Sequence, residues 1–267
     1  MIILDHITEP TLLIDKQKTI QNIQRMSQKA ADQNIRFRPH FKTHQSAIIG
    51  DWFRPFGTTA ITVSSVEMAQ YFARNGWKDI TLAFSLNWRQ IDMINQLAKL
   101  INLGILVESL ETIEFLEQNL LADVAVWLKV DSGAHRTGVS WEQSEAFALM
   151  IDRLGRNPNI HLAGLLTHAG HTYHAANRNE ICEYYLESVQ RMNSLCSTLQ
   201  AKGMPLLEIS VGDTPGCNIC EDLGNVDEIR PGNFVFFDAF QAKHGTCSLE
   251  DISIALACPV VAKHPER

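Results

Sequence analysis

Short apolar runs rich in β-branched residues alternate along most of this chain with segments of helical period. After a short strand at 11–15 and a helix from 16 to 34, the pattern predicts eight further strands, at 35–41, 58–65, 79–85, 102–108, 123–131, 160–168, 207–213 and 227–238. Helical segments lie between them at 66–75, 89–98, 109–119, 141–154 and 177–202. Strands that are apolar throughout and alternate with helices indicate a parallel sheet covered on both faces. Eight such units favour a closed α/β barrel of the (β/α)8 TIM type over an open doubly wound sheet.

Polar residues gather where the predicted strands end, which is the end of such a barrel where chemistry takes place. Lys42 follows the first of the eight strands, with His40 and His44 beside it, and Arg136 follows the fifth. A partly desolvated lysine can form an imine with an aldehyde, because its pKa falls toward neutrality. Lys42 is therefore a candidate Schiff-base lysine for pyridoxal phosphate, and an ordinary solvated lysine at a strand end is the alternative.

Glycine-containing turns follow the last two predicted strands, at residues 212–216 and 230–233. Barrels often bind phosphate at this place, through backbone N–H groups and the start of a short helix. Gly212 and Gly232 allow the backbone to approach an anion closely, and Thr214 can add a hydroxyl group. Either turn alone could be an ordinary turn, but the pair, opposite a lysine on the first strand, predicts a phosphate site.

Composition and charge narrow the class of partner. The net charge is −7 without a lysine-rich run, which argues against nucleic acid or an anionic membrane surface and favours a small-molecule ligand. The sequence contains neither an apolar run that would span a bilayer nor a signal peptide, so we expect a cytoplasmic protein. Its six cysteines are expected to be reduced thiols, and the single CxxC at Cys217 and Cys220 is weak evidence for a metal or redox site.

Five motifs resemble one family of enzymes. They are RPHFKTH (38–44), VDSGAHRTGV (130–139), THAGHTY (167–173), SVGDTPG (210–216) and EIRPGNFVFFD (228–238). In this order they resemble the D-serine dehydratase and D-threonine aldolase branch of the alanine racemase-like, fold type III pyridoxal phosphate enzymes. The resemblance covers residues from about 9 to 265. It implies a pyridoxal phosphate-dependent lyase that acts, as a homodimer, on a small β-hydroxy D-amino acid.

The resemblance also implies roles for individual residues. Lys42 would hold the cofactor and exchange the α-proton of the substrate, and Arg136 would approach the phenolic oxygen of the ring or the substrate carboxylate. Tyr173 and His168 would lie along the ring. The phosphate would be held by Gly212, Asp213, Thr214, Gly232 and Asn233. Because a carboxylate beside a phosphate is unfavourable, Asp213 is expected to turn its side chain away and cap a short helix.

The resemblance further implies a division of the chain. Residues 1–240 would form the pyridoxal phosphate-binding barrel, with 1–14 as a possible strand of a second domain, and 241–267 would begin an incomplete C-terminal β-domain. In the family that domain carries ligands for a divalent metal, which have no counterpart in this sequence. A metal is therefore expected only in a full-length form.

Other functions stay open at this stage. Dehydration and retro-aldol cleavage are both possible on this scaffold, and an amino-acid racemase would need a second acid or base on the opposite face of the ring. A non-catalytic pyridoxal phosphate-binding or homeostasis barrel would have a similar chain length. The spacing of His168, His171 and His174, near Asp131 and Asp213, would suit a metal hydrolase, but these histidines follow a strand in a glycine-containing segment rather than lying on a helix.

Overall fold

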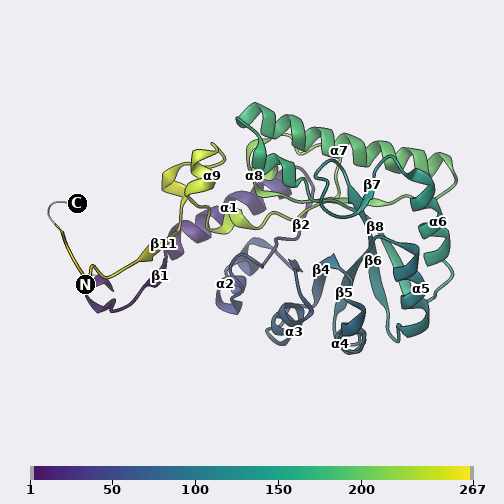
Figure 1. Cartoon of the computed structure of the whole chain (residues 1–267), viewed down its shortest axis with the longest axis horizontal. Coiled ribbons are helices and arrows are strands. Elements are labelled where there is room, and N and C mark those ends of the chain that lie inside the picture. The colour runs from purple at the N-terminus through teal and green to yellow at the C-terminus, as the bar shows by residue number, and fades with distance from the viewer. Residues whose placement is uncertain (1–2, 265–267) are drawn as a thin grey trace.

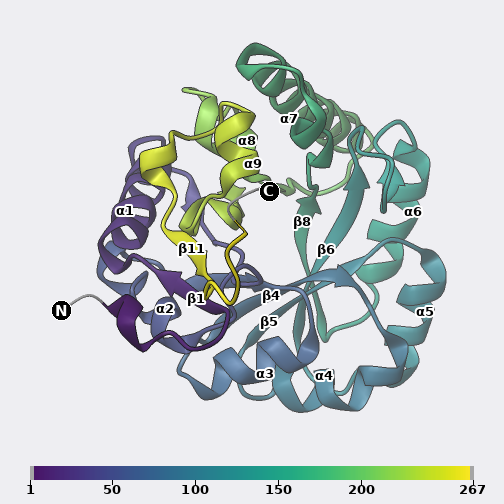
Figure 2. The same cartoon turned by 60° about the vertical axis from the view of Figure 1, so that its left-hand side comes forward.

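All eight predicted strands are present and lie side by side in one parallel sheet. The protein is described by a computed structural model that covers residues 3–264 (Figures 1 and 2). In spatial order the strands are β2 (Arg36–Phe37), β10 (Glu228–Ile229), β9 (Glu208–Val211), β8 (Ile160–Leu166), β6 (Val124–Asp131), β5 (Asn102–Val107), β4 (Asp79–Ser85) and β3 (Ala60–Val63). A two-residue strand, β7 (Val139–Ser140), pairs with the end of β6 outside this path.

The sheet closes on itself between β3 and the residues that follow β2. The Phe41 N–H donates to the Thr62 carbonyl at 2.8 Å, and the Thr62 N–H donates to the Pro39 carbonyl at 2.9 Å. His40 and Thr62 form the corresponding parallel bridge. The predicted (β/α)8 barrel is therefore confirmed.

The last strand is shorter than the sequence pattern predicts. Strand β10 covers only Glu228–Ile229, and the apolar residues of the predicted strand 227–238 continue instead into a 3-10 turn at Asn233–Val235. Pro231 has no N–H to contribute to the sheet, so the ladder ends before it. This early break leaves the turn at Gly232 exposed to the end of the barrel.

Helices surround the strands, as Figure 2 shows. The long ones match the predicted segments: α1 (Lys16–Asp32), α3 (Val66–Arg74), α4 (Ile91–Ala98), α5 (Leu110–Asn119), α6 (Ser144–Leu154) and α7 (Arg178–Ala201). Ser65 and Ser109 cap α3 and α5 by accepting backbone N–H groups. Two short helices, α2 (Ala47–Asp51) and α9 (Ala239–Lys243), were not predicted, whereas α8 (Thr214–Ile219) is the short helix that Asp213 was expected to cap. None of the described helices is both long and apolar enough to cross a membrane.

The barrel has an apolar shell and a more polar interior. Val126, Leu128 and Val130 of β6 are buried in the main core with residues of the surrounding helices. The alternate position Trp127 packs with the side chains of neighbouring strands in a small separate cluster. Because side chains alternate along a strand, Lys129 lies on the same face as Trp127, toward the interior.

The two ends of the described chain meet in a ribbon outside the barrel. Strand β1 (Thr11–Ile14) pairs antiparallel with β11 (Ile254–Ala257), and Figure 1 shows this pair at the left, away from the barrel strands. The pairing is the one that the resemblance implied for the N-terminal segment, although residues 1–2 lie outside the described part. The assignment of this ribbon to a second domain stays a prediction.

A buried carboxylate holds several strands together inside the barrel. Glu228 is fully buried and accepts from the Nε atoms of Arg36 and Arg38, each at 2.6 Å, and from the Ser210 hydroxyl at 2.7 Å. Arg38 also binds Asp79 of β4. Burial alone would raise the pKa of Glu228, but the two arginines and the hydrogen bonds lower it below its usual range. The charge of Glu228 therefore links β2, β9 and β10.

We predict that Glu228→Gln lowers the free energy of unfolding by about 3 kcal/mol, because the buried guanidinium group of Arg38 loses one of its two counter-charges and keeps only Asp79. The matched control is Glu208→Gln, whose partly exposed ion pair with Arg36 should contribute less than about 1 kcal/mol. Urea denaturation of the two variants checks the comparison. Equal losses would contradict the importance given to the buried carboxylate.

Candidate active site

A cavity of about 810 Å³ opens at the carboxyl ends of the barrel strands. Its wall is made by residues at or just after the ends of β2, β3, β4, β6, β8, β9 and β10. The residues expected from the sequence that line it are Lys42, Arg136, His168, Tyr173, Asp213, Gly232 and Asn233. The structure thus brings together side chains from segments nearly 200 residues apart in the sequence, as the closed barrel requires.

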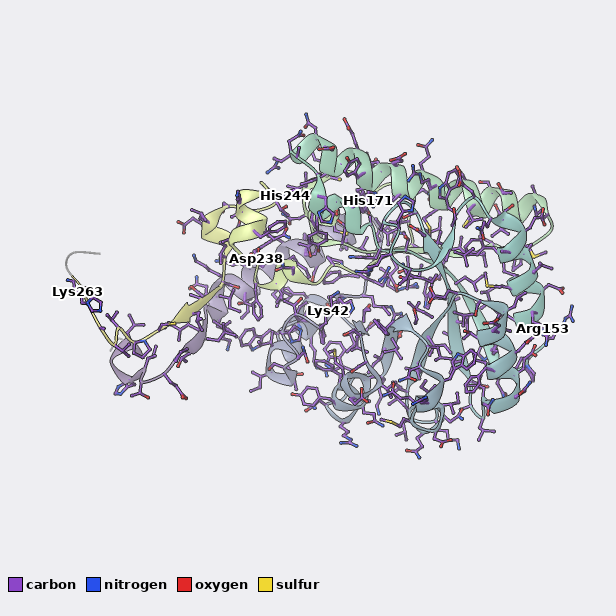
Figure 3. All side chains as sticks on the ribbon, in the orientation of Figure 1. Lys42, Arg153, His171, Asp238, His244 and Lys263 are labelled. Carbon is purple, nitrogen blue, oxygen red and sulfur yellow. The ribbon has the colours of Figure 1, made fainter. Side chains whose placement is uncertain are left out.

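Lys42 lies in the turn that follows the barrel closure. Its side chain reaches solvent through the cavity, and Figure 3 shows it in the middle of the molecule, on the side of Asp238 and far from Arg153 on α6. Partial burial of the amine, together with the charges of Arg136 and Arg230, lowers the pKa of Lys42 below its usual value. A larger fraction of this amine is therefore uncharged and nucleophilic than in a solvated lysine.

Two further cations, which the sequence did not single out as site residues, line the same cavity. Lys129 projects inward from β6 and is buried, and burial followed by the charges of Arg230 and Arg136 lowers its pKa to about 7. Arg230 follows β10, and its guanidinium donates to the Ser210 hydroxyl at 2.7 Å and the Thr167 carbonyl at 2.5 Å. A charged residue within an otherwise apolar strand was the available signal for Lys129.

His168 has a defined tautomer. Its Nδ1 lies in close contact with the carbonyl oxygen of Gly212, which can only accept, so Nδ1 carries the proton and Nε2 has a free lone pair. Burial, followed by the charges of Lys129 and Lys42, lowers the pKa of His168 to about 3. The imidazole is therefore neutral at physiological pH and offers an acceptor within the cavity.

Tyr173 and Asp213 are tied to the start of α8. The Tyr173 hydroxyl accepts the Thr214 N–H at 3.2 Å, and burial followed by the Asp213 charge raises the pKa of Tyr173 to about 12. The Asp213 carboxylate accepts the Gly216 N–H at 2.6 Å and the Thr172 hydroxyl at 2.9 Å, so the expected helix cap is present. Burial raises the pKa of Asp213 to about 7, so its negative charge is weakened.

The two glycine turns differ in how they face the cavity. Gly212 and Thr214 lie behind its wall: the Gly212 carbonyl contacts His168, and the Thr214 hydroxyl is buried without a hydrogen-bond partner among the described residues. Gly232 and Asn233 line the cavity directly. Within residues 3–264, the backbone N–H groups of Gly232 and Asn233 donate to no acceptor. Unpaired donors at a cavity wall are suited to an anion.

The three neighbouring histidines do not converge on a metal site. His168 lines the cavity, His171 contacts Ser188 and packs against Tyr184, and His174 is exposed. No group of three or more His, Cys, Asp or Glu residues in the described part of the chain could hold a metal ion.

His44 points away from the cavity, into an aromatic cluster formed by Phe41, Phe53 and Phe72. Its Nδ1 accepts the Ser46 N–H at 3.1 Å. Burial lowers the pKa of His44 to about 4, so the ring is neutral in the folded protein.

This arrangement predicts a pH-dependent contribution to stability. The unfolded chain binds a proton at His44 below pH ~6.5 while the folded chain does not, so stability is lost as pH falls below that value. Between pH 7 and pH 5.5 the loss should be about 1 kcal/mol for this group. His44→Asn keeps an acceptor for Ser46 but cannot take up a proton, so urea denaturation should show a pH dependence that is smaller by this amount. An identical pH dependence in parent and variant would refute a neutral buried His44.

Comparison with known proteins gives the same family that the motifs suggested. The family model for the N-terminal domain of alanine racemase matches residues 14–239. The chain is 30% identical to D-threo-3-hydroxyaspartate dehydratase of Delftia sp. (strain HT23), over 97% of this chain and 69% of that protein. It is 26% identical to D-serine dehydratase of Dictyostelium discoideum, over 99% and 71%. It is 24% identical to D-threonine aldolase of an Arthrobacter species, also over 99% and 71%.

The solved structure of the Delftia dehydratase superposes with a TM-score of 0.87 at 28% identity, over 95% of this chain and 68% of that one. The branch expected from the five motifs is therefore confirmed, as is the association of this branch with pyridoxal phosphate. With its closed barrel and a family match over residues 14–239, the chain belongs to the alanine racemase N-terminal domain family.

Proposed function

We propose that the chain is a pyridoxal phosphate-dependent lyase that acts on a small β-hydroxy D-amino acid. One observation carries the proposal: a lysine of lowered pKa shares a cavity with unpaired backbone N–H groups. Lys42 offers the amine that an aldehyde needs, and the Gly232 and Asn233 N–H groups offer donors to a phosphate. The residues present therefore fit the cofactor. The dehydratases and the aldolase among the relatives support this class of reaction.

Bound pyridoxal phosphate would supply an electron sink for the negative charge that develops on the substrate. Lys42 would hold the cofactor and then carry the α-proton, since a lowered pKa increases the fraction of uncharged amine that can accept a proton. Arg136 is exposed at the cavity and forms no ion pair within the described residues, so its guanidinium is free to bind a carboxylate or phenolic oxygen.

His168 and Tyr173 would orient the ring from the side of β8. The neutral His168 presents a lone pair at Nε2, and the phenol of Tyr173 stays protonated because its pKa is raised. The segment Gly212, Asp213 and Thr214 would position these two side chains, mostly from behind the cavity wall. Its polar atoms contact His168 and Tyr173 and cap the start of α8. Gly232 and Asn233 would bind the phosphate through their N–H groups. The Asn233 side chain is already engaged by Asp238 at 2.8 Å, so the backbone provides the donor.

The reaction proposed first is dehydration, because two of the three relatives compared are dehydratases. Loss of the β-hydroxyl group as water, after removal of the α-proton, would give an enamine, and hydrolysis of its imine tautomer by water would release a keto acid and ammonia. We also propose a cytoplasmic homodimer. The side chain of Phe84, which lines the cavity and is 64% exposed, is an apolar group that a second subunit would cover.

The test is release of keto acid and ammonia from D-serine and D-threo-3-hydroxyaspartate, with the L-isomers as controls and with pyridoxal phosphate and a divalent metal supplied. We predict turnover of at least one D-isomer and a loss of at least ~10³-fold in Lys42→Ala, because the amine that forms the imine is removed. Glycine and an aldehyde as products would favour the aldolase reaction. Cofactor binding without turnover of any D-amino acid would contradict the lyase proposal and favour a binding barrel.

A further inference from the structure

We propose that His40 and Thr43, at the end of the first barrel strand, form a side-chain half of the phosphate site opposite the backbone of the Gly232 turn. The inference rests on the proposed function and adds two residues to the predicted cradle. Both side chains line the cavity.

The end of β2 and the Gly232 turn are in direct contact. The His40 N–H donates to the Pro231 carbonyl at 2.9 Å. A Cβ atom added at Gly232 would lie 3.1 Å from the His40 carbonyl oxygen, 3.2 Å from the His40 Cβ and 3.3 Å from the Thr43 hydroxyl oxygen. Glycine at 232 therefore leaves room beside these two side chains. An anion held by the Gly232 and Asn233 N–H groups would be close to both of them.

The hydrogen bonding of His40 defines which of its nitrogens can donate. The backbone N–H of Lys42 donates to His40 Nδ1 at 3.3 Å, so Nδ1 is an acceptor and the proton of the neutral ring lies on Nε2. Burial, followed by the charges of Lys42 and Arg230, lowers the pKa of His40 well below its usual value, which keeps the ring neutral. Its Nε2–H has no acceptor within residues 3–264.

Thr43 offers a second donor of the same kind. Its hydroxyl makes no hydrogen bond with the described residues, although it borders the cavity. Two neutral donors without partners, on the same wall as two unpaired backbone N–H groups, are most simply explained by an oxygen-rich ligand group.

The other predicted half of the cradle lies mostly behind the cavity wall: of Gly212, Asp213 and Thr214, only Asp213 lines the cavity. The Thr214 N–H is used by Tyr173 and the Gly216 N–H by Asp213. Residue 215 is proline and has no N–H. The anion would therefore be bound mainly from the side of β2 and β10. Because the donors there are neutral, Lys42 and Arg136 are left to act on the aldehyde end and on the substrate.

The experiment compares binding of pyridoxal phosphate with binding of pyridoxal, which lacks the phosphate, followed by absorbance of the imine. His40→Asn keeps an acceptor for the Lys42 N–H but removes the Nε2–H donor. Thr43→Val removes the hydroxyl at nearly constant shape, and Thr43→Ser restores it. We expect His40→Asn and Thr43→Val each to lower the affinity for pyridoxal phosphate by about tenfold or more. The affinity for pyridoxal should fall by less than about twofold. Thr43→Ser should recover most of the affinity.

The outcomes separate this inference from the proposed function. If the parent chain binds no pyridoxal phosphate, both are overturned. If the parent binds it and both variants bind it equally well, only the phosphate assignment is overturned. The phosphate assignment is also overturned if the variants lose affinity for pyridoxal and for pyridoxal phosphate equally, since His40 and Thr43 would then act on the ring or on Lys42. Urea denaturation shows whether each variant is folded. If His40→Asn is not folded, the comparison of Thr43→Val with Thr43→Ser tests the phosphate assignment independently.

Discussion

The hydrogen bonds that join Pro39 and Phe41 to Thr62 close the barrel, and the site depends on this closure. Without it, β2 and β3 would be the two edges of an open sheet, and the residues after β2 would not face those after β6 and β8. With it, Lys42 lies just past the last paired residue, at the rim where all eight parallel strands end. The closure also directs His40 toward Gly232, because the same segment pairs with Pro231 on its other side.

Positive charge outnumbers negative charge around the cavity. Lys42, Lys129, Arg136 and Arg230 border it, and so do two carboxylates, Asp213 and Asp238, which both cap helices. Burial also raises the pKa of Asp213. Desolvation together with these neighbouring charges lowers the pKa values of both lysines and of the two cavity histidines. Such a site stabilises added negative charge, which a phosphate and a substrate carboxylate would both supply. The deeper pair of Arg38 and Glu228 compensates internally and belongs to the scaffold.

Most of the fold could be predicted from the sequence, because strands that are apolar throughout and helices of regular period are both strong local signals. The structure of the C-terminal part of the chain was harder to predict. The run FVFF at 234–237 has the composition of a strand, yet Pro231 and Gly232 end the ladder before it, and Phe234 and Val235 are buried as part of a turn. The helices α8 and α9 are too short for a periodic pattern, and only their capping residues Asp213 and Asp238 mark them.

The sequence was sufficient to predict which polar residues follow the end of each strand. Sequence could not show which polar atoms are already in use. Gly212 and Thr214 look equivalent to Gly232 and Asn233 along the chain, but the first pair lies behind the cavity wall, whereas the second lines the cavity with unpaired N–H groups. Lys129 and Arg230 were not predicted as site residues, because their inward direction depends on the register of β6 and β10 within the closed sheet.

Two lysines border the same cavity and both have a lowered pKa, so the identity of the imine lysine is the central claim. The most direct measurement is borohydride reduction of the chain loaded with pyridoxal phosphate, followed by digestion and mass spectrometry of the labelled peptide. The label is predicted on Lys42. A label on Lys129, or labels spread over surface lysines, would contradict this account of the site.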